Sequence, residues 1–284
     1  MTLQYSARLP RNVPVKARVY ALAAPRASAR PLQSLAEALG LRDAEAELTT
    51  SASAVGLRAG RWSIAMHKTS GALRALHVDR YAQADAPVFE VSDRQAQRAA
   101  DKFVARLDLL PKGQAKVMAV THLRQAGADP KGGERIDERV LDAGVVYGRV
   151  IDELPVIGPG GMALVHVAGD GQVVGARRIW RTLGRGVATV KLRPAEWAKE
   201  DFEASVKRVM GDVEVVKAQL GYLEFGELDR QTLIEPVYAF VYVVRHGEVA
   251  SKHVHVVHAG EKAQGKLMGA RRFAAAKQRA RKGD

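Results

Sequence analysis

The sequence predicts an α+β protein built from repeated units of one helix and an antiparallel sheet, with a basic arm at each end. Segments with helical spacing of apolar residues come singly, whereas segments with strand-like alternation come in pairs joined by turns. Strands joined by tight turns pair antiparallel, because a parallel connection needs a long crossover. The order of one helix followed by strands occurs three times, which favours helices lying on antiparallel sheets.

Three helices are predicted, near residues 32–40, 93–109 and 195–210. The first follows Pro31, and the third follows Pro194; proline is favoured in the first turn of a helix. The second begins with a capping box, since Ser92 is followed by Gln95 three residues later.

Hairpins are predicted from alternating runs that flank turn residues. The clearest joins residues 162–167 to 172–180 through Gly169-Asp170-Gly171. Two final strands, 236–244 and 249–257, flank a turn that we place at His246-Gly247, which pairs residue 240 with 253.

Other segments read less regularly. Residues 145–157 are expected to form one long strand interrupted by Pro155, and the polar, glycine-rich residues 127–138 a loop. Gly158-Pro159-Gly160-Gly161 is interpreted as a tight turn, because a strand-like run follows it and a phosphate loop leads into a helix.

Charge divides the 284-residue chain into a nearly neutral body and two basic ends. The net charge is +13, of which residues 1–30 and residues 261–284 each carry +6. An anionic partner would therefore meet the ends first. The predicted division is a basic arm over 1–30, a first unit over 31–125, a second region over 140–260 and a basic tail over 261–284.

Composition excludes several classes of site. The chain has no cysteine, so it holds no disulfide, thiolate metal site or cysteine nucleophile. The N-terminus lacks the apolar core of a Sec-type signal, and no run approaches the roughly 18 apolar residues of a transmembrane helix. We expect a soluble chain that is cytoplasmic or exported by another route, and we expect no cofactor.

The histidines suggest a recognition face on the last two strands. Alternation in extended strands puts five aromatic and histidine side chains on one face, and we expect this face to be half exposed. Its members are Tyr238, Phe240, Tyr242, His253 and His255. A zinc site needs three or four convergent ligands, so no metal is predicted. Without a Gly-x-Ser-x-Gly motif, no catalytic residue is predicted either.

Basic residues give two further hypotheses. Residues 177–181 (RRIWR) could stack on and neutralise a nucleic acid strand, but we favour a solvated strand with Trp180 at the edge of the core. The C-terminal tail has few bulky apolar residues, and we expect it to contact an anionic surface. The expected contacts are Arg271, Arg272, Lys277, Arg279, Arg281 and Lys282.

Two stretches carry a family resemblance. They are residues 147–161 (YGRVIDELPVIGPGG), continued by 167–175 and Trp180-Arg181, and residues 234–240 (IEPVYAF). Over about residues 32–260 the chain resembles PepSY-like and YycI/YycH-like proteins of unknown function. That resemblance implies a helix packed on an antiparallel sheet, repeated, and a non-catalytic binding or regulatory role, often at the cell envelope. The chain departs from the family at both ends, where relatives usually begin with a signal or anchor and this chain has basic arms.

These observations predict a non-catalytic binding, regulatory or structural-assembly protein, with a protein partner or a second copy as its partner. One alternative is a binder of nucleic acid or another polyanion through the basic arms. A second alternative is an enzyme that uses the histidine-rich strand face.

Overall fold

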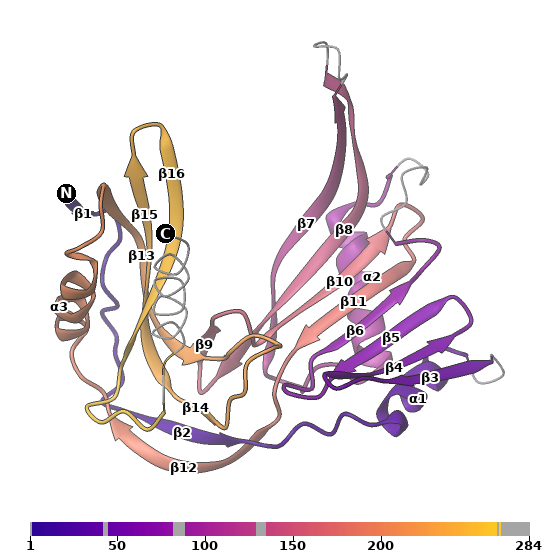
Figure 1. The fold of residues 1–284 in the computed structure, drawn as a ribbon, viewed down its shortest axis with the longest axis horizontal. Helices are drawn as coiled ribbons and strands as arrows, with labels where there is room; N and C mark the ends of the chain where they lie inside the picture. The colour runs from indigo at the N-terminus through magenta and orange to yellow at the C-terminus, as the bar shows by residue number, and fades with distance from the viewer. Residues whose placement is uncertain (1, 42–44, 82–88, 129–134, 266, 268–284) are drawn as a thin grey trace, which may run out of the picture.

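The structure, a computed structural model, describes residues 2–41, 45–81, 89–128, 135–265 and 267 (Figure 1). Strands account for 50% of it and helices for 15%. The protein is therefore mainly β, and the predicted α+β fold of repeated helix-plus-antiparallel-sheet units is wrong. Hairpins that look like separate units in the sequence join edge to edge into one sheet.

That sheet has thirteen strands. In the order of their pairing, eleven of them are β16 (Val249–His258), β15 (Pro236–His246), β13 (Asp212–Leu223), β9 (Leu154–Ile157), β8 (Arg135–Ile151), β10 (Met162–Ala168), β11 (Val173–Ile179), β6 (Leu73–His77), β5 (Trp62–His67), β4 (Ala54–Ala59) and β3 (Ala46–Thr50). In addition, β1 (Leu3–Tyr5) pairs with β13, and β7 (Ala115–Ala128) pairs with β8.

The sheet is mixed, which corrects the expectation of antiparallel pairing throughout. β1 runs parallel to β13, and the end of β13 runs parallel to β9, where Tyr222 pairs with Val156. Both parallel pairs join segments far apart in the sequence. Local turn signals reveal only hairpins, which are antiparallel, so these contacts could not be read from them.

A second, three-stranded sheet lies below the large one, under β13–β16 and the middle of the molecule (Figure 1). It consists of β12 (Leu183–Lys191), β2 (Lys16–Leu22) and β14 (Leu233–Ile234). Residues 1–30 thus supply β1 and β2, and Val19 is fully buried. Residues 1–30, predicted to be a basic arm, are therefore part of both sheets, and in β2 the exposed Lys16 and Arg18 alternate with Ala17 and Val19, which enter the core.

The molecule has two lobes, and each has its own helices packed on the sheet (Figure 1). In the first lobe, α1 (Ala29–Ala38) and α2 (Asp93–Arg106) cover the sheet from β3 to β8, with β10 and β11. In the second lobe, α3 (Ala195–Val206) covers β13, β15 and β16. The three predicted helices are confirmed, and so is the capping box, in which the side chains of Ser92 and Gln95 each accept from the other's backbone N–H.

A buried ion cluster ties the end of β13 to the first lobe. Glu224 is fully buried; its carboxylate accepts the backbone N–H of Arg181 at 2.7 Å and lies 3.0 Å from Nη1 of Arg149. The guanidinium of Arg149 also lies over the ring of Trp180. Arg177 is exposed and Trp180 packs into the core, as predicted for residues 177–181, but Arg181 is only 3% exposed, so the solvated-strand prediction is wrong for that residue.

The glycine-rich segment 158–161, predicted to be a tight turn, forms a series of bends that connects β9 to β10 and lies against the same cluster. The N–H of Gly160 donates to the carbonyl of Glu224 at 3.0 Å. A Cβ at Gly160 would lie 2.3 Å from the carbonyl oxygen of Phe225. Glycine is needed here because two backbone segments approach each other closely.

Candidate protein-binding edge

The last hairpin, β15–β16, has a register two residues away from the predicted one. Phe240 pairs with His255, and Tyr242 with His253, without a break over the whole hairpin. The turn residues are Gly247 and Glu248, and Gly247 has φ +58°. Glycine at the first position of a two-residue turn is typical of type II′, so the turn begins at Gly247 and not one residue earlier.

The predicted recognition face lies largely beneath α3. Tyr238 and Phe240 are each 1% exposed, and Phe202 of α3 stacks on Phe240 with ring centroids 4.7 Å apart. Burial, with a smaller contribution from Glu196, raises the pKa of Tyr238 to about 12. Its hydroxyl donates to the carbonyl of Arg193 at 2.7 Å. These side chains form the core of the second lobe.

The remaining members of that face lie at its border. Tyr242 is 9% exposed, and its ring stacks on the exposed His253. His255 is half buried, and burial lowers its pKa, so its imidazole is neutral at pH 7. The structure thus brings all five predicted residues together, but as packing partners of α3 with only His253 exposed.

The opposite face of the same hairpin carries apolar side chains that the prediction overlooked. Val254 is 59% exposed, and it pairs across the strands with the half-buried Val241. Val243 and Val256 lie on the same face and are also half buried. The spacing of Val254 and Val256 could have indicated this face, since alternate residues of a strand lie on the same side.

The outer edge of β16 has a defined set of free backbone groups. The N–H of Ala259 donates to the carbonyl of Pro236 at 3.1 Å. In an antiparallel ladder, hydrogen-bonded pairs alternate with pairs that point their N–H and C=O outward. Odd-numbered residues of β16 therefore bond to β15, and even-numbered residues face outward.

One outward-facing backbone group of this edge already has a hydrogen-bond partner. The carbonyl of His258 accepts from Nε of Arg193 at 2.9 Å, as this alternation requires. Within the described residues, β16 pairs only with β15. The free edge therefore runs over residues 250–256, and its outward-facing residues are Ala250, Lys252, Val254 and Val256.

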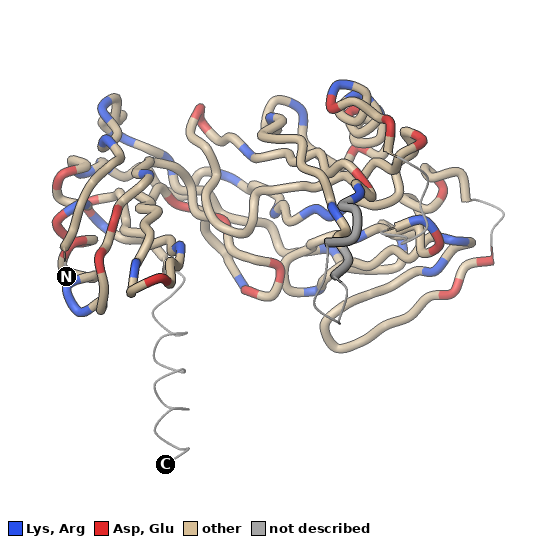
Figure 2. Tube along the Cα trace, turned by 90° about the horizontal axis from the view of Figure 1, so that it is seen from above, with Lys and Arg blue, Asp and Glu red and all other residues tan. Residues whose placement is uncertain are grey.

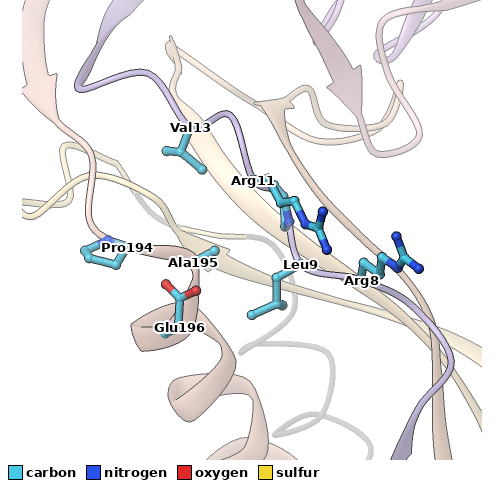
Figure 3. Close-up of a pocket in the computed structure, with 8 residues that line it drawn as sticks. Arg8, Leu9, Arg11, Val13, Pro194, Ala195 and Glu196 are labelled. Atoms are coloured by element: carbon cyan, nitrogen blue, oxygen red, sulfur yellow. The ribbon is translucent and has the colours of Figure 1, made fainter.

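A second surface feature is a hollow of about 580 Å³ at the start of α3 (Figure 3). Arg8 and Arg11 line it together with Pro194 and Glu196, and both arginines are exposed. Elsewhere, basic and acidic residues are interspersed over both lobes (Figure 2). The hollow is thus a place where residues of the basic N-terminal segment gather on the folded surface.

Three further predictions concern the C-terminal tail, metal binding and membrane-spanning helices. The tail residues Arg271, Arg272, Lys277, Arg279, Arg281 and Lys282 lie outside the described residues. In the described part of the chain, no three histidine or acidic residues come together as metal ligands. None of its helices is both long enough and apolar enough to cross a membrane.

Comparison with known proteins reveals similarity in fold. No protein-family model matches the chain, and no curated protein matches its sequence. The chain is similar to the crystal structure of an uncharacterized protein from Eubacterium rectale ATCC 33656, with a TM-score of 0.59 and 13% identity. The similarity covers 94% of this chain and 91% of that one. A similar fold therefore occurs in at least one other protein.

Proposed function

We propose that this chain is a non-catalytic binding and assembly protein that accepts a β-strand of a partner protein along the free edge of β16. Strand addition uses the unpaired N–H and C=O groups of an edge for affinity and neighbouring side chains for specificity. β16 offers both: outward backbone groups over residues 250–256, and on the adjoining face the exposed Val254 with half-buried valines around it. The observation that carries the proposal is a regular edge that, among the described strands, pairs on one side only.

The other sheet edges of the described residues are irregular or shorter than β16. β7 has three register irregularities against β8, and β12 has two against β2. β3 has five residues, β1 three and β14 two. Bulges and short length are the usual means by which proteins protect sheet edges. β16, in contrast, is ten residues long and has no irregularity against β15.

The rest of the molecule supports a binding role. The histidine-rich face on which an enzyme alternative depends is packed against α3 through Phe202. The buried cluster around Glu224 joins the two lobes and would hold the second lobe, with its free edge, in a fixed orientation. The resemblance to PepSY-like proteins stays a prediction, and the binding role that it implies is consistent with this proposal.

The test compares the proteins that co-purify with the wild type and with two variants. The tagged full chain is isolated from the cells that make it, alongside Val254→Lys, which places a charge on the free edge. Val187→Lys is the control, because Val187 is 46% exposed on the irregular strand β12. We expect a binding partner, either a second copy or another protein, to co-purify in stoichiometric amount with the wild type and the control. It should not co-purify with Val254→Lys. If all three forms retain the same companion, or none does, the proposal is wrong.

A second candidate function is the binding of a polyanion through the basic segments. The hollow at the start of α3 favours it, because Arg8 and Arg11 lie beside the N-terminal end of a helix, where backbone N–H groups attract anions. Affinity for nucleic acid would fall steeply between about 50 and 200 mM salt. Binding that is unchanged when Arg8 and Arg11 are replaced by glutamine and the chain is truncated after Leu267 would eliminate this candidate.

A further inference from the structure

The proposed function leaves open which strand the β16 edge accepts, and the geometry of the edge points to an answer. We infer that β16 pairs antiparallel with β16 of a second copy of this chain, about a two-fold axis at His253. This inference rests on the proposed function and adds the identity of the partner. It follows from the position of the free edge, from the side chains beside it and from the symmetry of the pairing.

The ends of the free edge determine the register. Within the described residues no strand pairs with the outer edge of β16 over residues 250–256, and Arg193 occupies the next outward carbonyl, that of His258. An isologous pair of strands is symmetric about its centre. The register that uses the whole free stretch is therefore centred on residue 253, which pairs Ala250 with the partner's Val256 and Lys252 with the partner's Val254.

The backbone alternation agrees with this register. Even-numbered residues point their N–H and C=O groups outward, and in this register even-numbered residues meet even-numbered ones, so all of these groups form hydrogen bonds. His253 bonds to β15, so it meets the partner's His253 as a non-hydrogen-bonded pair. In a register displaced by one residue, the outward N–H and C=O groups of one copy would face residues of the other copy whose N–H and C=O groups already bond to β15.

The side chains are also compatible with pairing. Like charges directly opposite each other destabilise a sheet. The only charged residue of the free edge, Lys252, meets an apolar residue in this register. Val254 is 59% exposed, and it would be covered by the aliphatic stem of the partner's Lys252. The two valine faces would then adjoin across the dimer, each bordered by Leu267, which packs with Val256 against the same apolar cluster.

The cysteine-free sequence allows a direct test. In a non-hydrogen-bonded antiparallel pair the two Cα atoms lie about 4.5 Å apart, within the range that a disulfide spans. The variant His253→Cys, which has a single cysteine at an exposed position, is expected to form a disulfide-linked dimer under mild oxidation. Val187→Cys on β12 is the matched control and is expected to stay monomeric under the same conditions.

A second measurement does not depend on cross-linking. By symmetry, Val254→Lys creates two lysine–lysine pairs with Lys252, so we expect the dimer Kd to rise about tenfold or more in sedimentation equilibrium. Val187→Lys should leave the Kd unchanged. Circular dichroism and thermal melting show whether each variant folds as the wild type does.

The outcomes separate the two proposals. Cross-linking at position 253 together with dissociation by Val254→Lys supports the homodimer. A wild-type chain that is monomeric at concentrations of about 100 μM, and that does not cross-link at position 253, overturns it. If that monomeric chain still takes a different companion protein from cells and loses it in Val254→Lys, the strand-accepting function holds and only the second copy is excluded.

Discussion

Glu224 is the residue whose loss should damage the fold most, because it is the carboxylate between two buried guanidinium groups. Its carboxylate lies 3.0 Å from Nη1 of Arg149 and 3.7 Å from Nη1 of Arg181. The three side chains are 0%, 1% and 2% exposed, so water cannot replace the lost contacts. Removing one partner of a buried pair leaves an uncompensated charge, which costs about 3–5 kcal/mol. We therefore expect Glu224→Ala to lower the free energy of unfolding by that amount.

Glu227→Ala is the matched control, three residues further along the chain. Glu227 pairs with Arg177 at 3.0 Å, but the two side chains are 36% and 50% exposed. Exposed pairs of this kind contribute about 0–1 kcal/mol. Urea unfolding followed by circular dichroism measures both variants. Equal losses of stability in Glu224→Ala and Glu227→Ala would refute the view that the buried cluster holds the two lobes together.

Three further predictions concern single positions. Ser92→Ala removes the capping box of α2 and should cost about 1 kcal/mol in thermal unfolding, and an unchanged melting temperature would contradict the role of the cap. Gly160→Ala places a Cβ 2.3 Å from a backbone oxygen and should lower the free energy of unfolding by on the order of 1–3 kcal/mol. Gly186→Ala is the control: its Cβ meets nothing within 4 Å, and the free energy of unfolding should change by less than about 0.5 kcal/mol. Burial raises the pKa of Glu235, but the imidazole of His258 at 3.5 Å and hydrogen bonds from two backbone N–H groups outweigh it, so the pKa lies below its usual value. At pH values above the ordinary glutamate pKa of about 4.3, the carboxylate should accept the hydrogen bond from the N–H of Gln264. This hydrogen bond should be lost as the pH falls through the lower pKa of the folded state. An amide chemical shift of Gln264 that does not titrate below a pH of about 4.3 would contradict this.

The local elements could be predicted because their signals lie within a few residues of one another. Ser92 and Gln95 identified the start of α2, and Gly169-Asp170-Gly171 identified the β10–β11 hairpin. One local turn was missed. Asp152 and Glu153 connect β8 to β9 with φ of 47° and 64°, a conformation that glycine or asparagine usually signals. Residues 145–157 therefore read as one strand.

The long-range arrangement could not be predicted, because it depends on pairing between distant segments. Nothing local to Tyr5 or Val215 indicates that β1 joins β13. The environment of Arg181 likewise depends on Glu224, forty-three residues away. An arginine beside a tryptophan reads as a surface feature unless the buried acid that neutralises it is known. The charge pattern of residues 177–181 was therefore misread, although the strand itself was found.

The candidate site was predicted in part. The face of residues 238, 240, 242, 253 and 255 was assembled correctly, because a register error of two residues keeps every side chain on its face. Its exposure was misjudged, since the contact between Phe202 and Phe240 joins segments of distant sequence. The free edge depends on which strands lack a neighbour, a property of the whole sheet.

Hydrogen exchange along β16 tests the central claim most directly, because it reports on individual backbone amides. The measurement compares the amides of Lys252, Val254 and Val256 with those of His253 and His255, in the assembly isolated from cells and in the same protein after extensive dilution. Strand addition predicts that all five amides are protected in the assembly and that only the two histidine amides stay protected after dilution. If Lys252, Val254 and Val256 exchange freely in the assembly as well, the β16 edge accepts no strand and the account is wrong.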